Sequence, residues 1–395
     1  MRNFAPQMEK DMQSYRLSDL VKIKNGKDHK MLSNGKYPVL GSGGIMRYVD
    51  KFLYDKPSVL LPRKGTLDNI QYCDMPFWTV DTLYYTEVNT NLANPYYLYR
   101  YLSLLDLSNL DSGTGVPSMT FDNYYGLKIF LPNIERQTKI AQILQTLDKK
   151  ITINRQINQN LEAMAKQLYD YWFVQFDFPN EEGKPYKSSG GEMVWNEKLK
   201  RMIPKEWTNA NIYQLASISK ETVNPLARPN ELFKHYSLPE YDKTGTYAEE
   251  YGIDIQSAKF TVTNNCILVS KLNPWTSRVI CGNRESNQIC STEFVVWNPA
   301  SMKTKGFLFM LAKSAKFIEY CTQGATGTSH SHRRINPELM MKFDFSYNSE
   351  IAIKFSRLIE NIIGKLHDNI AQLKILTKQR DELLPLLMNG QITIE

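Results

Sequence analysis

Two segments of the chain, about Ile134 to Trp172 and Ile351 to Leu387, carry the same amphipathic pattern of apolar residues. In the first segment the apolar positions step by three and four residues, which is typical of the seam of a coiled coil. Five seam positions match between the segments at a constant separation of 215 residues: Leu147 with Ile362, Ile151 with Leu366, Asn154 with Asn369, Leu161 with Leu376, and Leu168 with Leu383. The chain is therefore expected to contain one long helix twice.

Shorter matches upstream of the helices keep the same order in both halves. Val59-Leu60 pairs with Ile267-Leu268, and Thr114-Gly115 pairs with Thr326-Gly327. The separation of the matched strings grows along the chain, as expected when loops of different length are inserted into a duplicated unit. These matches predict an internal repeat that includes the globular parts of the chain.

The repeat predicts two α+β domains and two long helices. A chain of 395 residues is too long for one ordinary hydrophobic core. The segment between the first helix and the second domain is rich in Gly, Ser and Pro and offers little apolar surface, so we expect it to be a linker or an extended arm. The expected order is a first domain at 1–131, a long helix at 132–177, the arm at 178–206, a second domain at 207–346 and a second long helix at 347–395.

Local signals place several elements inside the domains. Asn94 followed by Pro95 predicts the start of a helix that runs to Leu105, because an Asn cap and a proline in the first turn are favoured there. In the second domain we expect strands at Cys266 to Ser270 and Glu293 to Trp297, and a helix near Lys305 to Tyr320.

The length of the two long helices argues against ordinary core helices. About 38 residues at 1.5 Å per residue span roughly 57 Å, which is more than a domain of this size can cover. Two such helices can pack antiparallel as a coiled coil, with one globular domain at each end. Asn154 and Asn369 fall on the seam, where polar residues can select the register.

Composition argues against several functional classes. No apolar run approaches the roughly 20 residues of a membrane span, and Met1 to Lys10 lacks the apolar core of a signal peptide, so a cytoplasmic protein is expected. The five cysteines form no CxxC pair, and His330 and His332 lack further ligands at metal spacing, so we expect no disulfide framework and no metal site. The chain has no GxxxxGK[ST] phosphate loop, which argues against an ATPase.

A net charge of +7 is a mild basic excess that suits a polyanionic partner but does not establish one. Three strings give stronger guidance: Leu131-Pro132-Asn133-Ile134-Glu135-Arg136-Gln137, Leu61-Pro62-Arg63-Lys64-Gly65-Thr66, and Gly183-Lys184-Pro185-Tyr186-Lys187. They resemble the specificity subunits of Type I restriction-modification systems, and the resemblance covers nearly the whole chain.

This resemblance implies a non-catalytic subunit that binds double-stranded DNA and needs no cofactor. In the family, each of two target recognition domains reads one half of a split DNA sequence, and the helix pair sets the spacer between the halves. Such subunits dock two adenine methyltransferase subunits and, in the full assembly, restriction subunits that are ATPases and endonucleases. These proteins are therefore the expected partners.

Basic and polar side chains near the matched strands and loops are the candidate DNA contacts, because cations bind phosphates and loop side chains read base edges. Solvated loops and strand exits are the alternative interpretation, and Trp275 is expected to pack. The second half has Ser270-Lys271-Leu272-Asn273-Pro274 in place of Pro62-Arg63-Lys64-Gly65, so the contacts need not correspond residue by residue. The candidates are Arg63, Lys64, Thr66, Thr114 and Ser118 in the first half, and Lys271, Arg278, Thr328, Ser329, His330, Arg333 and Arg334 in the second.

Two other functions are compatible with the sequence. A complete DNA methyltransferase is one, because Asn94-Pro95-Tyr96-Tyr97 looks like the Asn-Pro-Pro-Tyr of adenine methyltransferases and Gly41-Ser42-Gly43-Gly44 follows a strand. However, the second proline is missing, and no acidic residue follows the glycines at the spacing of a nucleotide site. The other is a coiled-coil scaffold that does not contact DNA, which a duplex-binding assay at low salt would distinguish.

Overall fold

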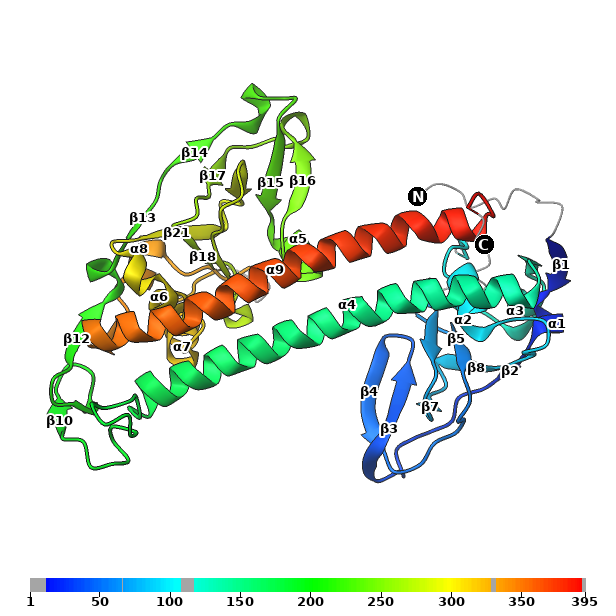
Figure 1. Cartoon of the computed structure of the whole chain (residues 1–395), viewed down its shortest axis with the longest axis horizontal. Helices are drawn as coiled ribbons and strands as arrows, with labels where there is room; N and C mark the ends of the chain where they lie inside the picture. Colours follow the sequence, from blue (N-terminus) through cyan, green and yellow to red (C-terminus); the bar gives the residue numbers. More distant parts are fainter. Residues whose placement is uncertain (1–11, 66, 108–116, 328–331, 393–395) are drawn as a thin grey trace. The chain divides into compact units, whose positions relative to one another are not determined.

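The computed structural model describes residues 12–65, 67–107, 117–327 and 332–392 (Figure 1). The chain divides into two compact units: unit 1 comprises Met1–Ile153 with Lys374–Glu395, and unit 2 comprises Asn154–Leu373. The division passes through both long helices, α4 (Ile134–Tyr169) and α9 (Ser349–Met388). Each unit therefore contains one globular α+β domain and one segment of each long helix.

Unit 1 is built on a four-stranded antiparallel sheet. β5 is an interior strand of this sheet and is buried along its whole length, as its uninterrupted apolar run predicts. The strand order is β2 (Val21–Lys24), β8 (Leu83–Val88), β5 (Ser58–Pro62) and β6 (Gln71–Cys73). Beside it stand a three-stranded sheet in the order β4 (Gly44–Val49), β3 (Asn34–Gly41) and β7 (Trp78–Thr79), and the pair β1 (Gln13–Arg16) and β9 (Lys128–Leu131).

Short helices complete the first domain: α1 (Leu17–Leu20), α2 (Pro95–Leu102) and α3 (Phe121–Tyr125). The Asn94 side chain accepts hydrogen bonds from the backbone N–H groups of Tyr96 and Tyr97, at 3.0 and 3.1 Å, as predicted for the cap of α2. The helix ends at Leu102 rather than Leu105, because the following residues form turns whose N–H groups donate three residues back.

The hydrophobic core of unit 1 combines the main sheet, α2 and the ends of both long helices. Val59 and Tyr97 lie in the same buried cluster as Leu384, Leu387 and Met388 from the last turns of α9. Helix α9 continues through Pro385 to Met388. The last turns of α9 are thus part of the core of the first domain.

Unit 2 repeats the main sheet of unit 1. Its strand order is β13 (Ala216–Ile218), β21 (Phe294–Pro299), β18 (Ile267–Ser270) and β19 (Val279–Cys281), which takes the places of β2, β8, β5 and β6 in turn. The pair β12 (Thr208–Asn211) and β22 (Asp344–Tyr347) likewise repeats β1 and β9. The duplication inferred from the sequence is therefore visible in the topology.

The second sheets of the two units differ. Unit 2 has five strands where unit 1 has three, because the connection between the matched strands is longer, at 219–266 against 25–57. This insertion accounts for much of the growing separation between the matched strings. The strand order is β14 (Thr222–Val223), β17 (Lys259–Thr261), β20 (Gln288–Cys290), β15 (Leu232–Tyr236) and β16 (Ala248–Tyr251).

The helix expected near Lys305 to Tyr320 is two helices, so that prediction was wrong in its bounds. The chain breaks at Lys313-Ser314, where the Ser314 side chain accepts from the N–H of Phe317 and caps a new helix. The helices of the second domain are α5 (Leu238–Thr244), α6 (Lys305–Ala312), α7 (Ala315–Gln323) and α8 (Pro337–Met341). Single 3-10 turns lie at Ile212–Gln214, Pro225–Ala227, Gly252–Asp254, Pro274–Thr276 and Met302–Thr304.

The long helices pack against each other within each unit. In unit 2 the Asn369 side chain donates to the Asn158 side chain at 3.0 Å, and in unit 1 Arg380 lies 3.4 Å from Asp148. None of the predicted seam residues is fully exposed. Ile151, Asn154, Leu366 and Leu376 are buried, and Leu147, Leu161, Leu168, Ile362, Asn369 and Leu383 are partly buried.

The first long helix ends earlier than the 132–177 expected from the sequence. α4 stops at Tyr169, and a single turn of π-helix follows at Asp170–Val174. Tyr169, Trp172 and Phe173 belong to the main core of unit 2.

The arm at 178–206 was expected to be a linker or extended arm with little apolar surface to bury, but it packs on the core of unit 2. Phe178 and Ile203 are buried in the core of unit 2, and the Phe178 ring stacks on Tyr186 and Trp207, with centroids 4.8 and 5.1 Å apart. A hairpin of β10 (Met193–Asn196) and β11 (Arg201–Pro204) closes the arm. The prediction failed because a few aromatic residues outweigh many glycines and serines once they find partners to pack on.

Candidate nucleic-acid interface

In unit 1 the residues after β5 meet the polar loop that precedes α3. The N–H of Met119 donates to the carbonyl of Arg63 at 2.9 Å, and the N–H of Gly65 donates to the carbonyl of Pro117 at 3.0 Å. Lys64 and Ser118 form an isolated β-bridge between these bonds. The residues after β5 and the loop before α3 were separate candidates in the sequence, and the structure places them side by side. We call this surface the first junction (Arg63–Gly65 with Pro117–Met119).

The two cations of the first junction, Arg63 and Lys64, differ in how closely neighbouring residues hold their side chains. Arg63 is partly buried, because its guanidinium lies over the Tyr84 ring, 6.0 Å from the centroid, and donates to the Asp81 carbonyl at 3.3 Å. Lys64 is exposed and forms no ion pair with any residue that the structure describes. Lys64 is therefore the better placed of the two for a phosphate group, and Arg63 is held in a fixed direction.

The turn between β3 and β4 lies beside the first junction. Asn69 donates to the Ser42 carbonyl at 2.6 Å, and Gln71 donates to the Gly41 carbonyl at 2.9 Å. A β-carbon on Gly65 would lie only 3.4 Å from Oγ of Ser42. Sequence reasoning missed these polar residues, although two β-rich runs separated by Gly41 to Gly44 are a hairpin signal. The glycines join two strands rather than a strand and a helix, so they do not form the nucleotide loop considered above.

Unit 2 contains the corresponding junction after β18 (Lys271–Asn273 with Arg333–Ile335). The N–H of Ile335 donates to the carbonyl of Lys271 at 3.0 Å, and the N–H of Asn273 donates to the carbonyl of Arg333 at 2.8 Å. The Asn273 side chain accepts in return from the N–H of Arg333 at 3.1 Å, and Asn273 itself adopts a φ of +48°. An asparagine suits this position because it tolerates the left-handed conformation. The structure thus brings Lys271 and Arg333 together.

Two other candidate cations of unit 2 are neutralised by neighbours. Arg278 donates twice to the Asp242 carboxylate, at 2.6 and 2.8 Å. Arg334 makes a similar two-pronged contact with Glu293, at 2.9 and 3.0 Å, and this contact holds the pKa of the Arg334 guanidinium above its ordinary value. Such paired bonds are strong and directional. A phosphate would have to displace these carboxylates, whereas Lys271 forms no ion pair with the described residues.

The remaining candidates cannot be placed. Thr66, Thr114, Thr328, Ser329 and His330 lie outside the described residues. Trp275 is described, and 44% of its surface is exposed, so it is only partly packed against its neighbours. It stands between Asn273 and Ser277, which both have positive φ, and this tight backbone leaves the indole at the surface.

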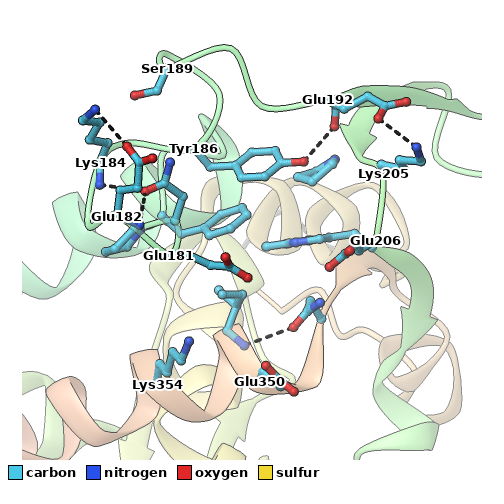
Figure 2. Close-up of a pocket in the computed structure, with 17 residues that line it drawn as sticks. Glu181, Glu182, Lys184, Tyr186, Ser189, Glu192, Lys205, Glu206, Glu350 and Lys354 are labelled. Atoms are coloured by element: carbon cyan, nitrogen blue, oxygen red, sulfur yellow. Dashed lines mark hydrogen bonds and ion pairs between the residues drawn. The ribbon is translucent and has the colours of Figure 1, made fainter.

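Unit 2 also contains a cavity of about 760 Å³ between the arm and the start of α9 (Figure 2). Its charged lining residues are Glu181, Glu182, Glu192, Glu206 and Glu350 against Lys184, Lys205 and Lys354, with two ion pairs, Lys184 with Glu182 and Lys205 with Glu192. This excess of carboxylates repels phosphate. We therefore do not include the cavity among the candidate DNA contacts.

Within the described ranges, no group of three or more His, Cys, Asp or Glu side chains is arranged to hold a metal ion. Cys73, Cys266, Cys281, Cys290 and Cys321 are all buried free thiols. Of the helices that the structure describes, none combines the length and the apolar character needed to cross a membrane.

The chain is similar in sequence and in fold to proteins of one kind. The family model of the Type I restriction modification DNA specificity domain matches residues 9–163. The HindI specificity subunit of Haemophilus influenzae is 25% identical over 384 residues, covering 81% of this chain and 82% of its own length. The MjaIX specificity subunit of Methanocaldococcus jannaschii is 23% identical over 313 residues, covering 76% of this chain and 69% of its own.

One solved structure shares the fold over nearly the whole chain. It is the specificity subunit of a Type I restriction-modification system from M. genitalium, with a TM-score of 0.66 and 15% sequence identity. The match covers 96% of this chain and 97% of the other. At this identity the likeness concerns the arrangement of elements and not individual side chains.

Proposed function

Because the chain belongs to the specificity subunits of Type I restriction-modification systems, we propose that each of its two domains reads one half of a split DNA sequence. The observation that carries the proposal is the repeated main sheet, β2-β8-β5-β6 and β13-β21-β18-β19, with unlike loops. A duplicated scaffold suits a duplex with two half-sites, since the symmetry of a binding protein follows that of its site. Unlike loops make the two half-sites different in sequence.

The two junctions are the proposed DNA contacts. In unit 1, Lys64 would bind phosphate, and Arg63 and Ser118 would reach base edges. In unit 2, Lys271 would bind phosphate and Arg333 would reach base edges. Phosphate contacts supply affinity and base contacts supply selectivity, so a junction with both kinds of side chain can do both. This assignment is supported by the joining of strand exit and loop in both units.

The long helices would set the spacer and dock the partner subunits. Both are long, at 36 residues for α4 and 40 for α9, and both leave apolar side chains exposed. Exposed apolar side chains on a long helix are compatible with a surface on which another protein packs. These exposed side chains are Ile134, Ile143, Ile153 and Ile375 in unit 1, and Ile157, Met164 and Leu358 in unit 2.

The proposed partners are two adenine methyltransferase subunits and, in the full complex, restriction subunits with ATPase and endonuclease activity. The chain itself is the specificity component and not an enzyme. Its task would be to place the methyltransferase on the target adenine. Double-stranded DNA is the remaining partner of the assembly.

Exchanging one domain tests the division of labour. The chain is produced with its methyltransferase partner, and residues 15–131 are replaced by the matching domain of a relative. Methylome sequencing should then show a motif in which one half has changed and the other half, with the spacer, is retained. If both halves change together, the two domains do not read independently and the proposal is wrong.

A further inference from the structure

Equivalent segments of the two units carry opposite charge. In unit 1, residues 25–57 join β2 to β5 and contain six basic residues against Asp28, Asp50 and Asp55, an excess of three positive charges. In unit 2, residues 219–266 join the equivalent strands and contain five basic and seven acidic residues, an excess of two negative charges. The topology was duplicated, but the charge of this segment was not.

The lysines of the unit 1 segment are exposed, although the Lys36 ammonium group lies over the Tyr37 ring, 5.2 Å from its centroid. Lys27, Lys30, Lys36, Lys51 and Lys56 are all exposed, and none of them forms an ion pair with a residue in the described part of the chain. The nearest acid in sequence, Asp28, is engaged by the backbone N–H of Lys30 at 3.0 Å. These lysines therefore keep their full charge available to a partner in solution.

The cations of the unit 2 segment are mostly engaged. Arg228 pairs with Glu231 at 3.3 Å, and Lys234 pairs with Glu285 at 3.2 Å. Lys259 donates to the Ser257 carbonyl at 3.0 Å, and burial lowers the pKa of its ammonium group. Only Lys220 and Lys243 are exposed there without an ion pair to the described residues. Together with seven carboxylates, they do not form a surface that attracts a polyanion.

The fold places three of these lysines, Lys30, Lys36 and Lys51, at one end of a hairpin. β3 and β4 pair with Tyr37 opposite Val49, so Lys36 and Lys51 flank the same end. The loop that holds Lys30 is attached to that end, because the backbone N–H of Asp50 donates to the Ser33 carbonyl at 3.0 Å and the Arg47 guanidinium donates to the Leu32 carbonyl at 2.6 Å. We call this hairpin with its attached loop, residues 27–56, the basic hairpin.

The other end of the basic hairpin is its turn, Ser42 to Gly44, which lies beside the first junction. The eight residues of β3 span about 26 Å at roughly 3.3 Å per residue, equal to about eight base pairs of B-DNA at 3.4 Å each. If the turn lies at the half-site, the lysine end reaches the sugar-phosphate backbone outside it. Lysines suit that place because phosphate contacts need charge and not a fixed geometry.

We propose that the basic hairpin of the first domain clamps the phosphate backbone flanking its half-site, and that the second domain has no counterpart. The two domains would then contribute unequally to the salt-dependent part of the affinity. The inference rests on the proposed function, in which the first domain binds one half-site. It goes beyond that function by assigning a sequence-independent contact to a named element.

Matched pairs of lysines test the proposal. The variants are Lys36→Gln with Lys51→Gln in the basic hairpin, and Lys220→Gln with Lys243→Gln in unit 2 as the control. Each chain is co-produced with its methyltransferase partner, and binding to a duplex that carries the methylated motif is measured from 50 to 200 mM salt. Binding by the unaltered complex checks the proposed function separately.

The hairpin variant should bind more weakly, with a slope of log affinity against log salt that is smaller by about 1.8, since each phosphate contact contributes about 0.9. Between 50 and 200 mM salt, the fold-decrease in the affinity of the hairpin variant should be smaller than that of the unaltered complex by a factor of about twelve. The control variant should keep the original slope, and both variants should methylate the original motif. An unchanged slope in the hairpin variant, an equal loss in the control, or a changed motif would each overturn the proposal.

Discussion

Replacing Asp148 with alanine should loosen the end of α9 from the first domain. In unit 1 the Asp148 carboxylate on α4 accepts hydrogen bonds from Tyr96 and Arg100 of α2, and its other oxygen lies 3.4 Å from the guanidinium of Arg380 on α9. The Arg100 side chain is only 10% exposed and also donates to the Tyr96 hydroxyl at 3.1 Å. One carboxylate therefore joins three helices. Its removal leaves Arg100 without its anion and leaves Arg380 paired with Asp381 alone, at 2.7 Å.

The size of the effect follows from burial. Breaking a fully buried ion pair by removing one partner costs about 3 to 5 kcal/mol, because the other charge is left uncompensated. Asp148 is 25% exposed and Arg380 is 22% exposed, so water partly replaces the lost contact. We therefore expect a loss of about 2 to 3 kcal/mol in the local free energy of opening, after discounting for solvent screening.

Hydrogen exchange is the suitable assay, because global unfolding of a chain with two domains is not a two-state transition. Amides near Arg380 in α9 should exchange about 30- to 140-fold faster in Asp148→Ala, since each 1.4 kcal/mol is a factor of ten. Glu135→Ala is the control, because it removes an exposed pair with Lys139 on the same helix and should change little. Exchange within threefold of the unaltered protein would refute the role given to Asp148.

Two further predictions concern the DNA contacts and the spacer. Arg63→Ala with Lys64→Ala should weaken binding of the assembled complex and reduce its salt slope; unchanged affinity and slope would make this junction ordinary solvated surface. Four residues inserted after Lys150, with four more after Lys378 to keep the helices paired, add about 6 Å along the axis. The spacer of the methylated motif should lengthen by about one or two base pairs, with both half-sites unchanged. If the spacer keeps its length in a variant that folds and assembles, the helix pair does not set the spacer.

Local patterns in the sequence determined the long helices, the repeat and the cap of α2. A helical seam repeats at a constant spacing because side chains three and four residues apart share a face, whatever they pack against. The Asn94 cap was predictable because an asparagine side chain reaches N–H groups only two and three residues away. The buried strand at Ser58 to Pro62 was predictable from its own apolar run.

Only the tertiary structure decided which candidate cations stay free. Arg278 and Arg334 look the same as Lys64 in the sequence, but Asp242 and Glu293, 36 and 41 residues away, neutralise them. The arm was misjudged for a related reason, because the partners of Phe178 and Ile203 include residues far along the chain. Side chains distant in sequence meet only when the fold is complete, so charge pairing and burial depend on the whole fold and not on the local pattern.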